Sequence, residues 1–184
     1  MIAVVVLLVS GALALISSTQ TWLTVTLADS QLAVKGSESI PVLQPLSLAV
    51  LALGLALSIV GRVVRYVFGV LAVAIGAVLA WLSVGAAYEP GTSDVASVVT
   101  EHTGVAGEAP VSALVQSITS HAWPAITLAL AILIVLVGVF TLATAHSWRS
   151  SSRKYDAPAE RPAGVPLDTV DTWDDLSRGD DPTT

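Results

Sequence analysis

Uncharged apolar runs alternate with polar segments along this chain, and they predict four membrane-spanning helices. The runs are residues 1–18, 46–61, 66–88 and 122–145. A helix needs about 20 apolar residues to cross roughly 30 Å of hydrocarbon, where only bonds within the helix can satisfy the backbone. We therefore expect an all-α membrane protein whose first domain, residues 1–145, is a four-transmembrane-helix bundle.

The first run has two interpretations. It starts at Met1 without a basic residue before it, and Ala12-Leu13-Ala14 resembles the small-residue cleavage site of a signal peptide. A signal peptide normally carries a positive segment at its start, so we expect a retained helix. Cleavage would leave the orientation of the other three spans unchanged.

The polar segment after the first run has the pattern of a β-hairpin. Residues 21–27 contain a tryptophan and alternating β-branched residues, and residues 31–35 form a second such stretch. Residues 28–30 separate the two with a short polar turn. We expect a small extracytoplasmic hairpin that ends at Gly36.

Two short amphipathic helices are predicted between the third and fourth spans. Asp94 is expected to cap the first, which ends at Gly104, and Pro110 is expected to open the second. Their apolar faces follow helical spacing. These faces are Val95, Val98 and Val99 in the first helix, and Val111, Leu114, Val115 and Ile118 in the second.

Composition supports a membrane protein independently. The chain is 54% hydrophobic and 12% charged, with a mean hydropathy of +0.78, whereas soluble domains carry about 25% charged residues. It contains no cysteine, which excludes disulfides, cysteine nucleophiles and lipoprotein anchoring.

The basic residues predict the orientation. Arg62 and Arg65 lie between the second and third spans, and residues 149–154 add three more after the fourth. The positive-inside rule therefore places both termini in the cytoplasm. The opposite face is acidic, which argues against a nucleic-acid partner there. Its charged residues are Asp29, Lys35, Glu38, Glu89, Asp94, Glu101 and Glu108.

Small and aromatic residues indicate how the spans pack. Ala72, Gly76 and Ala80 recur at every fourth position of the third span, so we expect a neighbouring helix to approach closely there. Aromatic rings at span ends prefer the membrane interface, and we interpret three of them as interface anchors. They are Trp22, Tyr88 and Trp123.

The spans contain no charged residue in their interior, where ion-coupled carriers normally place one. His102, His121 and His146 are dispersed, and metal ligands normally lie closer together. No nucleophile and base pattern is present either. We therefore expect no cofactor, no metal and no enzymatic activity.

The second domain, residues 146–184, has the proline-rich composition of a disordered cytoplasmic tail. Its terminal motif, residues 170–183, differs because apolar residues recur there among acidic ones. We expect this motif to bind a cytosolic or membrane protein, since exposed aromatic residues tend to carry interface energy. Folding back onto the bundle is the alternative. The candidate partner-binding residues are Val170, Trp173, Asp174, Leu176, Arg178 and Asp181.

The terminal sequence Trp173-Asp174-Asp175-Leu176-Ser177-Arg178-Gly179-Asp180-Asp181-Pro182-Thr183 resembles the ending of the bacterial tryptophan biosynthesis-associated membrane proteins. Members of that family also have four spans and an aromatic-led, β-branched segment after the first, here residues 22–26. The resemblance implies a multi-pass protein of the bacterial plasma membrane, but it implies no established reaction.

Two functions follow as hypotheses. The first is a non-enzymatic adaptor or accessory protein that lies in the lipid bilayer and holds a partner through the tail. The second is an accessory transporter for an aromatic metabolite such as tryptophan, which would need a homo-oligomer to form a pore from uncharged helices.

Overall fold

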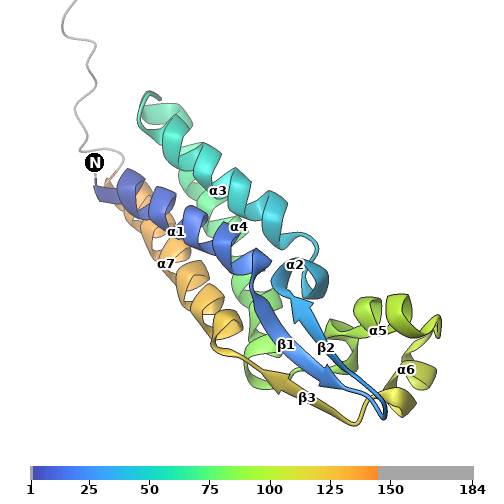
Figure 1. The fold of residues 1–184 in the computed structure, drawn as a ribbon. Coiled ribbons are helices and arrows are strands. Elements are labelled where there is room, and N and C mark those ends of the chain that lie inside the picture. The colour runs from blue at the N-terminus through green and yellow to red at the C-terminus, as the bar shows by residue number, and fades with distance from the viewer. Residues whose placement is uncertain (1, 145–184) are drawn as a thin grey trace, which may run out of the picture. The chain divides into compact units, whose positions relative to one another are not determined.

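A computed structural model describes residues 2–144 of the chain and shows four helices side by side, with a small sheet at one end (Figure 1). Three of these helices are long and apolar enough to cross a membrane: α1 (Ile2–Thr19), α4 (Arg62–Tyr88) and α7 (Ala122–Thr144). The second in sequence, α3 (Leu43–Leu57), has 15 residues, or about 22 Å at 1.5 Å per residue. Of the four expected spans, three are therefore full-length helices, and α3 is shorter than the expected run.

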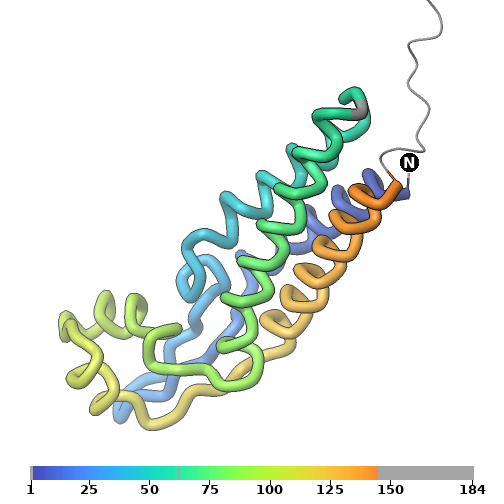
Figure 2. Tube along the Cα trace, turned by 180° about the vertical axis from the view of Figure 1, so that it is seen from behind, coloured from blue at the N-terminus to red at the C-terminus, as the bar shows by residue number. Residues whose placement is uncertain are grey.

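Glycines set the closest helix contacts. A Cβ on Gly76 of α4 would lie 2.8 Å from Val135 Cγ2 and 3.0 Å from the carbonyl oxygen of Ala131, both in α7. A Cβ on Gly138 of α7 would lie 2.7 Å from Val73 Cγ2 in α4. The two backbones approach closely because no side chain separates them there, and Figure 2 shows α4 running beside α7 along its length.

A second contact of this kind joins α1 to α3. A Cβ on Gly11 would lie 3.0 Å from Leu51 Cγ, and a Cβ on Gly54 would lie 3.0 Å from Leu8 Cδ2. The buried residues of α1 recur every three or four positions, so one stripe of this helix faces the rest of the bundle. The stripe is Ala3, Val4, Leu7, Ser10, Gly11, Ala14, Ser17 and Ser18.

The sheet contains three strands in the order β2-β1-β3. The predicted hairpin is confirmed as β1 (Thr21–Thr26) antiparallel to β2 (Gln31–Lys35). The third strand, β3 (Ser117–Ser120), pairs with the other edge of β1 and was not predicted. Ile118 was expected on a helix, but it lies in β3 opposite Val25.

A bulge in β1 explains its burial. Strict alternation would bury every second residue, whereas Trp22 and Leu23 are consecutive and both fully buried. The β1–β2 pairing is irregular between Thr21 and Leu23. The extra residue re-aims the side chains on either side of it, so both faces of β1 contribute to the core at this point.

Four short helical elements complete the described fold. They are α2 (Gly36–Ser39), η1 (Thr92–Asp94), α5 (Ala96–Thr103) and α6 (Glu108–Leu114). The stop at Gly104 is confirmed, since this residue adopts a left-handed φ of 72°. Two other boundary predictions are wrong: Asp94 lies within η1 and does not cap α5, and α6 begins at Glu108, ahead of Pro110.

Candidate functional site

The sheet end of the molecule is the candidate functional site, and we call residues 20–42 and 89–121 the headpiece. It joins the long helices almost without linkers. Only Gln20 separates α1 from β1, and only His121 separates β3 from α7. Lys35 ends β2 and Gly36 begins α2. These short connections position the headpiece directly on the ends of α1 and α7 (Figure 1).

Trp22 is the centre of this junction. Its indole Nε1 donates to the carbonyl oxygen of Ser17 at 2.9 Å, and it lies 3.2 Å from Ser17 Oγ. Gly36 lies against the same ring, because a Cβ there would be 2.6 Å from Trp22 Cε2. Trp22 is 0% exposed, so its expected role as an interface anchor is wrong. The bulge in β1 turns the ring into the protein, where it packs α1 against α2.

A second set of bonds holds β3 and the start of α7. The backbone N–H of His121 donates to the carbonyl oxygen of Trp22 at 2.8 Å, and His121 Nε2 lies 2.9 Å from Thr24 Oγ1. Ser120 Oγ donates to the carbonyl oxygen of Ala86 in α4 at 2.9 Å. The sheet is thereby connected to the start of α7 through β1 and to α4 through β3.

The short helices α5 and α6 are attached to the rest of the headpiece through α2. Ser97 Oγ of α5 donates to the carbonyl oxygen of Glu38 at 3.2 Å. The backbone N–H of Lys35 donates to Glu38 Oε2 at 2.7 Å, and Lys35 Nζ lies 4.0 Å from Glu38 Oε1. Val95, Val99 and Val111 are fully buried or nearly so. The two short helices therefore pack into the headpiece through these valines, whereas Leu114, which also belongs to the predicted apolar face, is 38% exposed.

A pocket of about 400 Å³ opens between the hairpin turn and the ends of α5 and α6. Asp29 contributes a carboxylate from the turn, and His102 contributes an imidazole from the last turn of α5. Such a mixed lining suits a small polar or cationic group. Within residues 2–144, no group of three metal-ligating side chains is found. The lining residues are Leu27, Ala28, Asp29, Ser30, His102, Thr103, Ala113, Leu114 and Gln116.

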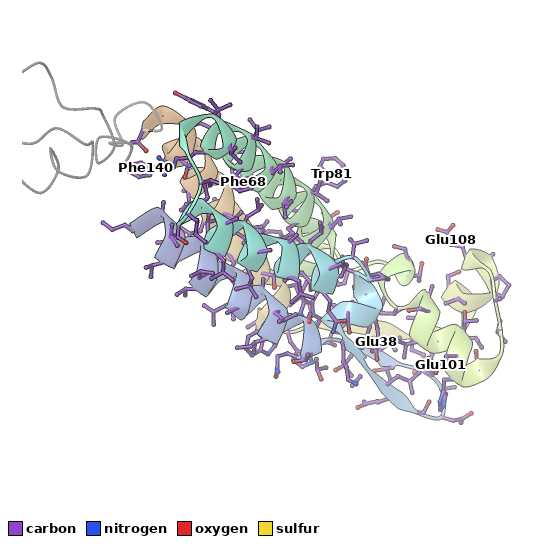
Figure 3. The ribbon with its side chains drawn as sticks, turned by 90° about the horizontal axis from the view of Figure 1, so that it is seen from above. Glu38, Phe68, Trp81, Glu101, Glu108 and Phe140 are labelled. Carbon is purple, nitrogen blue, oxygen red and sulfur yellow. The ribbon has the colours of Figure 1, made fainter. Side chains whose placement is uncertain are left out.

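The headpiece surface is acidic. Glu38, Glu101 and Glu108 all lie at this end of the molecule (Figure 3), and Glu101 and Glu108 are exposed. The sequence adds Asp29, Glu89 and Asp94 to this end and only Lys35 as a cation. Arg65 lies near the opposite end of the helices, in the first turn of α4, which begins at position 62. A partner for the headpiece would need to tolerate or complement negative charge.

The other residues singled out from the sequence are dispersed. Ala72 is fully buried, and Gly76 lies against α7, while Ala80 is half-buried. Tyr88 is 74% exposed, and Trp123 is half-buried. Trp81 of α4 is 83% exposed and points away from the bundle (Figure 3). The six candidate partner-binding residues, Val170 to Asp181, lie outside the described residues.

Sequence reasoning missed the bond between Ser17 Oγ and Thr127 Oγ1, which are 2.7 Å apart and buried. It also missed the pocket beside Asp29. The residues that form this bond, and those that line this pocket, come from distant parts of the chain. No periodic pattern relates them, so the sequence could not predict that they meet. Both serine and threonine were visible at the ends of their spans, but small hydroxyl residues are common there.

Together the long apolar helices and the small sheet define a multi-pass helical membrane protein with a folded headpiece at one end. The chain belongs to the Tryptophan-associated transmembrane protein family, whose model matches residues 4–183. The resemblance found at the terminal motif is thereby confirmed. No curated protein and no solved structure matches the chain.

Proposed function

We propose that this protein is a non-enzymatic adaptor of the bacterial plasma membrane, which couples its headpiece to a partner held by the cytoplasmic tail. In this proposal α1, α3, α4 and α7 all cross the bilayer, and both termini are cytoplasmic. The tail motif at Trp173 and Leu176 binds the partner. The headpiece lies outside and receives the signal or ligand to which the partner responds.

The supporting observation is the direct connection of strands to spans. One residue links α1 to β1, and one residue links β3 to α7. A displacement of the sheet therefore acts on both helices, because a single linking residue leaves little freedom to absorb it. The short connections therefore pass a movement of the headpiece to α1 and α7, since a flexible linker at either point would lose it.

The charge distribution supports the four-span arrangement. Residues 39–61 carry no charge, so α3 and its flanking turns offer 23 uncharged positions although the helix has 15 residues. The arginines at the start of α4 favour the cytoplasmic side for that end. The acidic headpiece at the other end fits the outer side.

Partner capture tests the proposal. The intact chain, a chain truncated after Ala163 and the double variant Trp173→Ala/Leu176→Ala are crosslinked in cells and purified in mild detergent. The partner should be lost in the last two and retained in the matched tail control Val165→Ala/Leu167→Ala. Equal recovery from all four would remove the tail from the proposal. An insertion of Gly-Gly after Gln20 should leave partner capture unchanged, because it alters the headpiece junction and not the tail that holds the partner.

Transport is the rival function, and vesicles test it directly. Purified protein reconstituted into vesicles is mixed with labelled tryptophan, and uptake is measured against protein-free vesicles. An adaptor gives no saturable uptake. Saturable uptake would overturn the proposal.

A further inference from the structure

An apolar groove of about 400 Å³ runs between α3 and α4. Three alanines form the α3 wall and larger side chains form the α4 wall, so the two helices leave a space that the alanine side chains do not fill. The lining residues are Ala49, Ala52, Leu53 and Ala56 of α3, with Phe68, Leu71 and Ile75 of α4. The groove faces the surroundings of the bundle, since Ala52 and Leu71 are both exposed.

The groove has the dimensions of a lipid chain. Its lining extends over eight residues on each helix, and the seven steps between the first and the last correspond to about 10 Å at 1.5 Å per residue. One leaflet of hydrocarbon is roughly 15 Å thick. An acyl chain that enters along the helices would therefore contact the lining over most of its depth.

A positive charge lies at one end of this groove. Arg65 precedes Phe68 by three positions, so the two lie on neighbouring parts of the same side of α4. Arg65 is half-buried, and its Nη2 donates to the carbonyl oxygen of Val60 in the α3–α4 turn at 3.1 Å. This bond keeps the guanidinium beside the α3–α4 turn, one helical turn before Phe68 of the groove lining.

We propose that the α3–α4 groove binds one anionic phospholipid, with an acyl chain between Ala52 and Leu71 and the phosphate beside Arg65. The apolar lining accounts for the chain, and the guanidinium accounts for the charge of the headgroup, since arginine pairs well with phosphate oxygens. The N-terminal turn of α4, which begins at Arg62, adds a favourable dipole for an anion at the same end.

The test uses the full-length protein in mild detergent and native mass spectrometry. Dioleoyl phosphatidylglycerol is the probe and dioleoyl phosphatidylcholine is the neutral comparison. The protein should retain the anionic lipid in preference. Arg65→Gln should lower its affinity for phosphatidylglycerol by roughly fivefold, the factor given by about 1 kcal/mol of headgroup attraction. Arg65→Lys should keep most of the preference.

Ala52→Leu tests the groove itself, because a leucine at this exposed position fills the space and leaves the buried core unchanged. It should abolish retention of both lipids. Ala129→Leu, at an exposed position of α7, is the matched control and should bind like the original chain. An anionic preference that survives in Ala52→Leu would overturn the proposal. So would a dimer that is lost in Ala52→Leu, since the groove would then hold a second copy of the chain.

Discussion

Ser17 Oγ and Thr127 Oγ1 lie 2.7 Å apart in the interior, although 110 positions separate them in the chain. The bond joins the last turn of α1 to the first two turns of α7, immediately inside the headpiece. The same serine accepts the indole N–H of Trp22 through its carbonyl oxygen. One residue therefore connects two long helices and the central strand.

The first prediction concerns this bond. Ser17→Ala and Thr127→Val should each destabilise the protein, and the double variant should lose less than the sum of the two. Interhelical bonds of this kind contribute about 0.6 kcal/mol on average in membrane proteins. Reversible unfolding in mixed detergent measures the free energy for each variant.

Ser10→Ala is the matched control, because Ser10 lies on the same helix and its buried hydroxyl has no hydrogen-bond partner within residues 2–144. Its removal should be neutral or slightly stabilising. Additive losses for the two members of the pair would show that the hydroxyls do not interact.

The second prediction concerns the α4–α7 contact. Gly76→Leu should destabilise the bundle by about 1 to 3 kcal/mol or prevent its assembly, because the new side chain overlaps Val135 and the Ala131 carbonyl. Thermal unfolding in detergent measures the loss. Gly85→Leu on the same helix should be tolerated, since a Cβ there meets nothing within 4 Å. Equal stability of the two variants would contradict the close contact.

The third prediction concerns the junction between bundle and sheet. Gly36→Ala should destabilise the headpiece by about 1 to 3 kcal/mol, because the added Cβ would lie 2.6 Å from the ring of Trp22. Gly61→Ala, where a Cβ meets nothing within 4 Å, should leave the melting temperature unchanged. If both variants melt together with the original chain, Trp22 is not confined as described.

The fourth prediction concerns topology. The chain has no cysteine, so single cysteines can be introduced at the exposed positions Gln44, Ser58 and Ser93. An impermeant maleimide should label Gln44→Cys and Ser93→Cys in intact cells, and Ser58→Cys only after the membrane is opened. This pattern requires both α3 and α4 to cross. Labelling of Gln44→Cys and Ser58→Cys on the same side would mean that α3 does not cross.

The sequence predicted the features that depend on local periodicity. Long apolar runs indicated α1, α4 and α7, and alternation around residues 21–35 indicated the hairpin. The sequence-based prediction was wrong where the same spacing of apolar residues fits both a helix and a strand. Ile118 continues the helical spacing of Val111 and Leu114, yet Val115 adopts an extended conformation and the chain pairs with β1. A four-residue strand of this kind is specified by its partner strand and not by its own residues.

The sequence also could not predict which helices pack against each other. Gly11, Gly54 and Gly138 were visible as small residues, but nothing in one sequence says that Gly11 meets Leu51 or that Gly138 meets Val73. Trp22 was misinterpreted for a related reason. A tryptophan at the end of a span resembles an interface residue, and only the irregular pairing of β1 turns its ring into the core.

The strand order β2-β1-β3 means that the central strand gains its two neighbours at different times during synthesis. β1 and β2 can pair as soon as residues 21–35 have emerged, but β3 begins at Ser117. At about 5 to 20 residues per second, the ribosome needs roughly 5 to 20 s to supply the missing strand. During that interval one edge of β1 exposes its backbone groups, and the strand of a neighbouring nascent chain could occupy it. Crowded translation at the membrane therefore exposes this protein to strand exchange between copies.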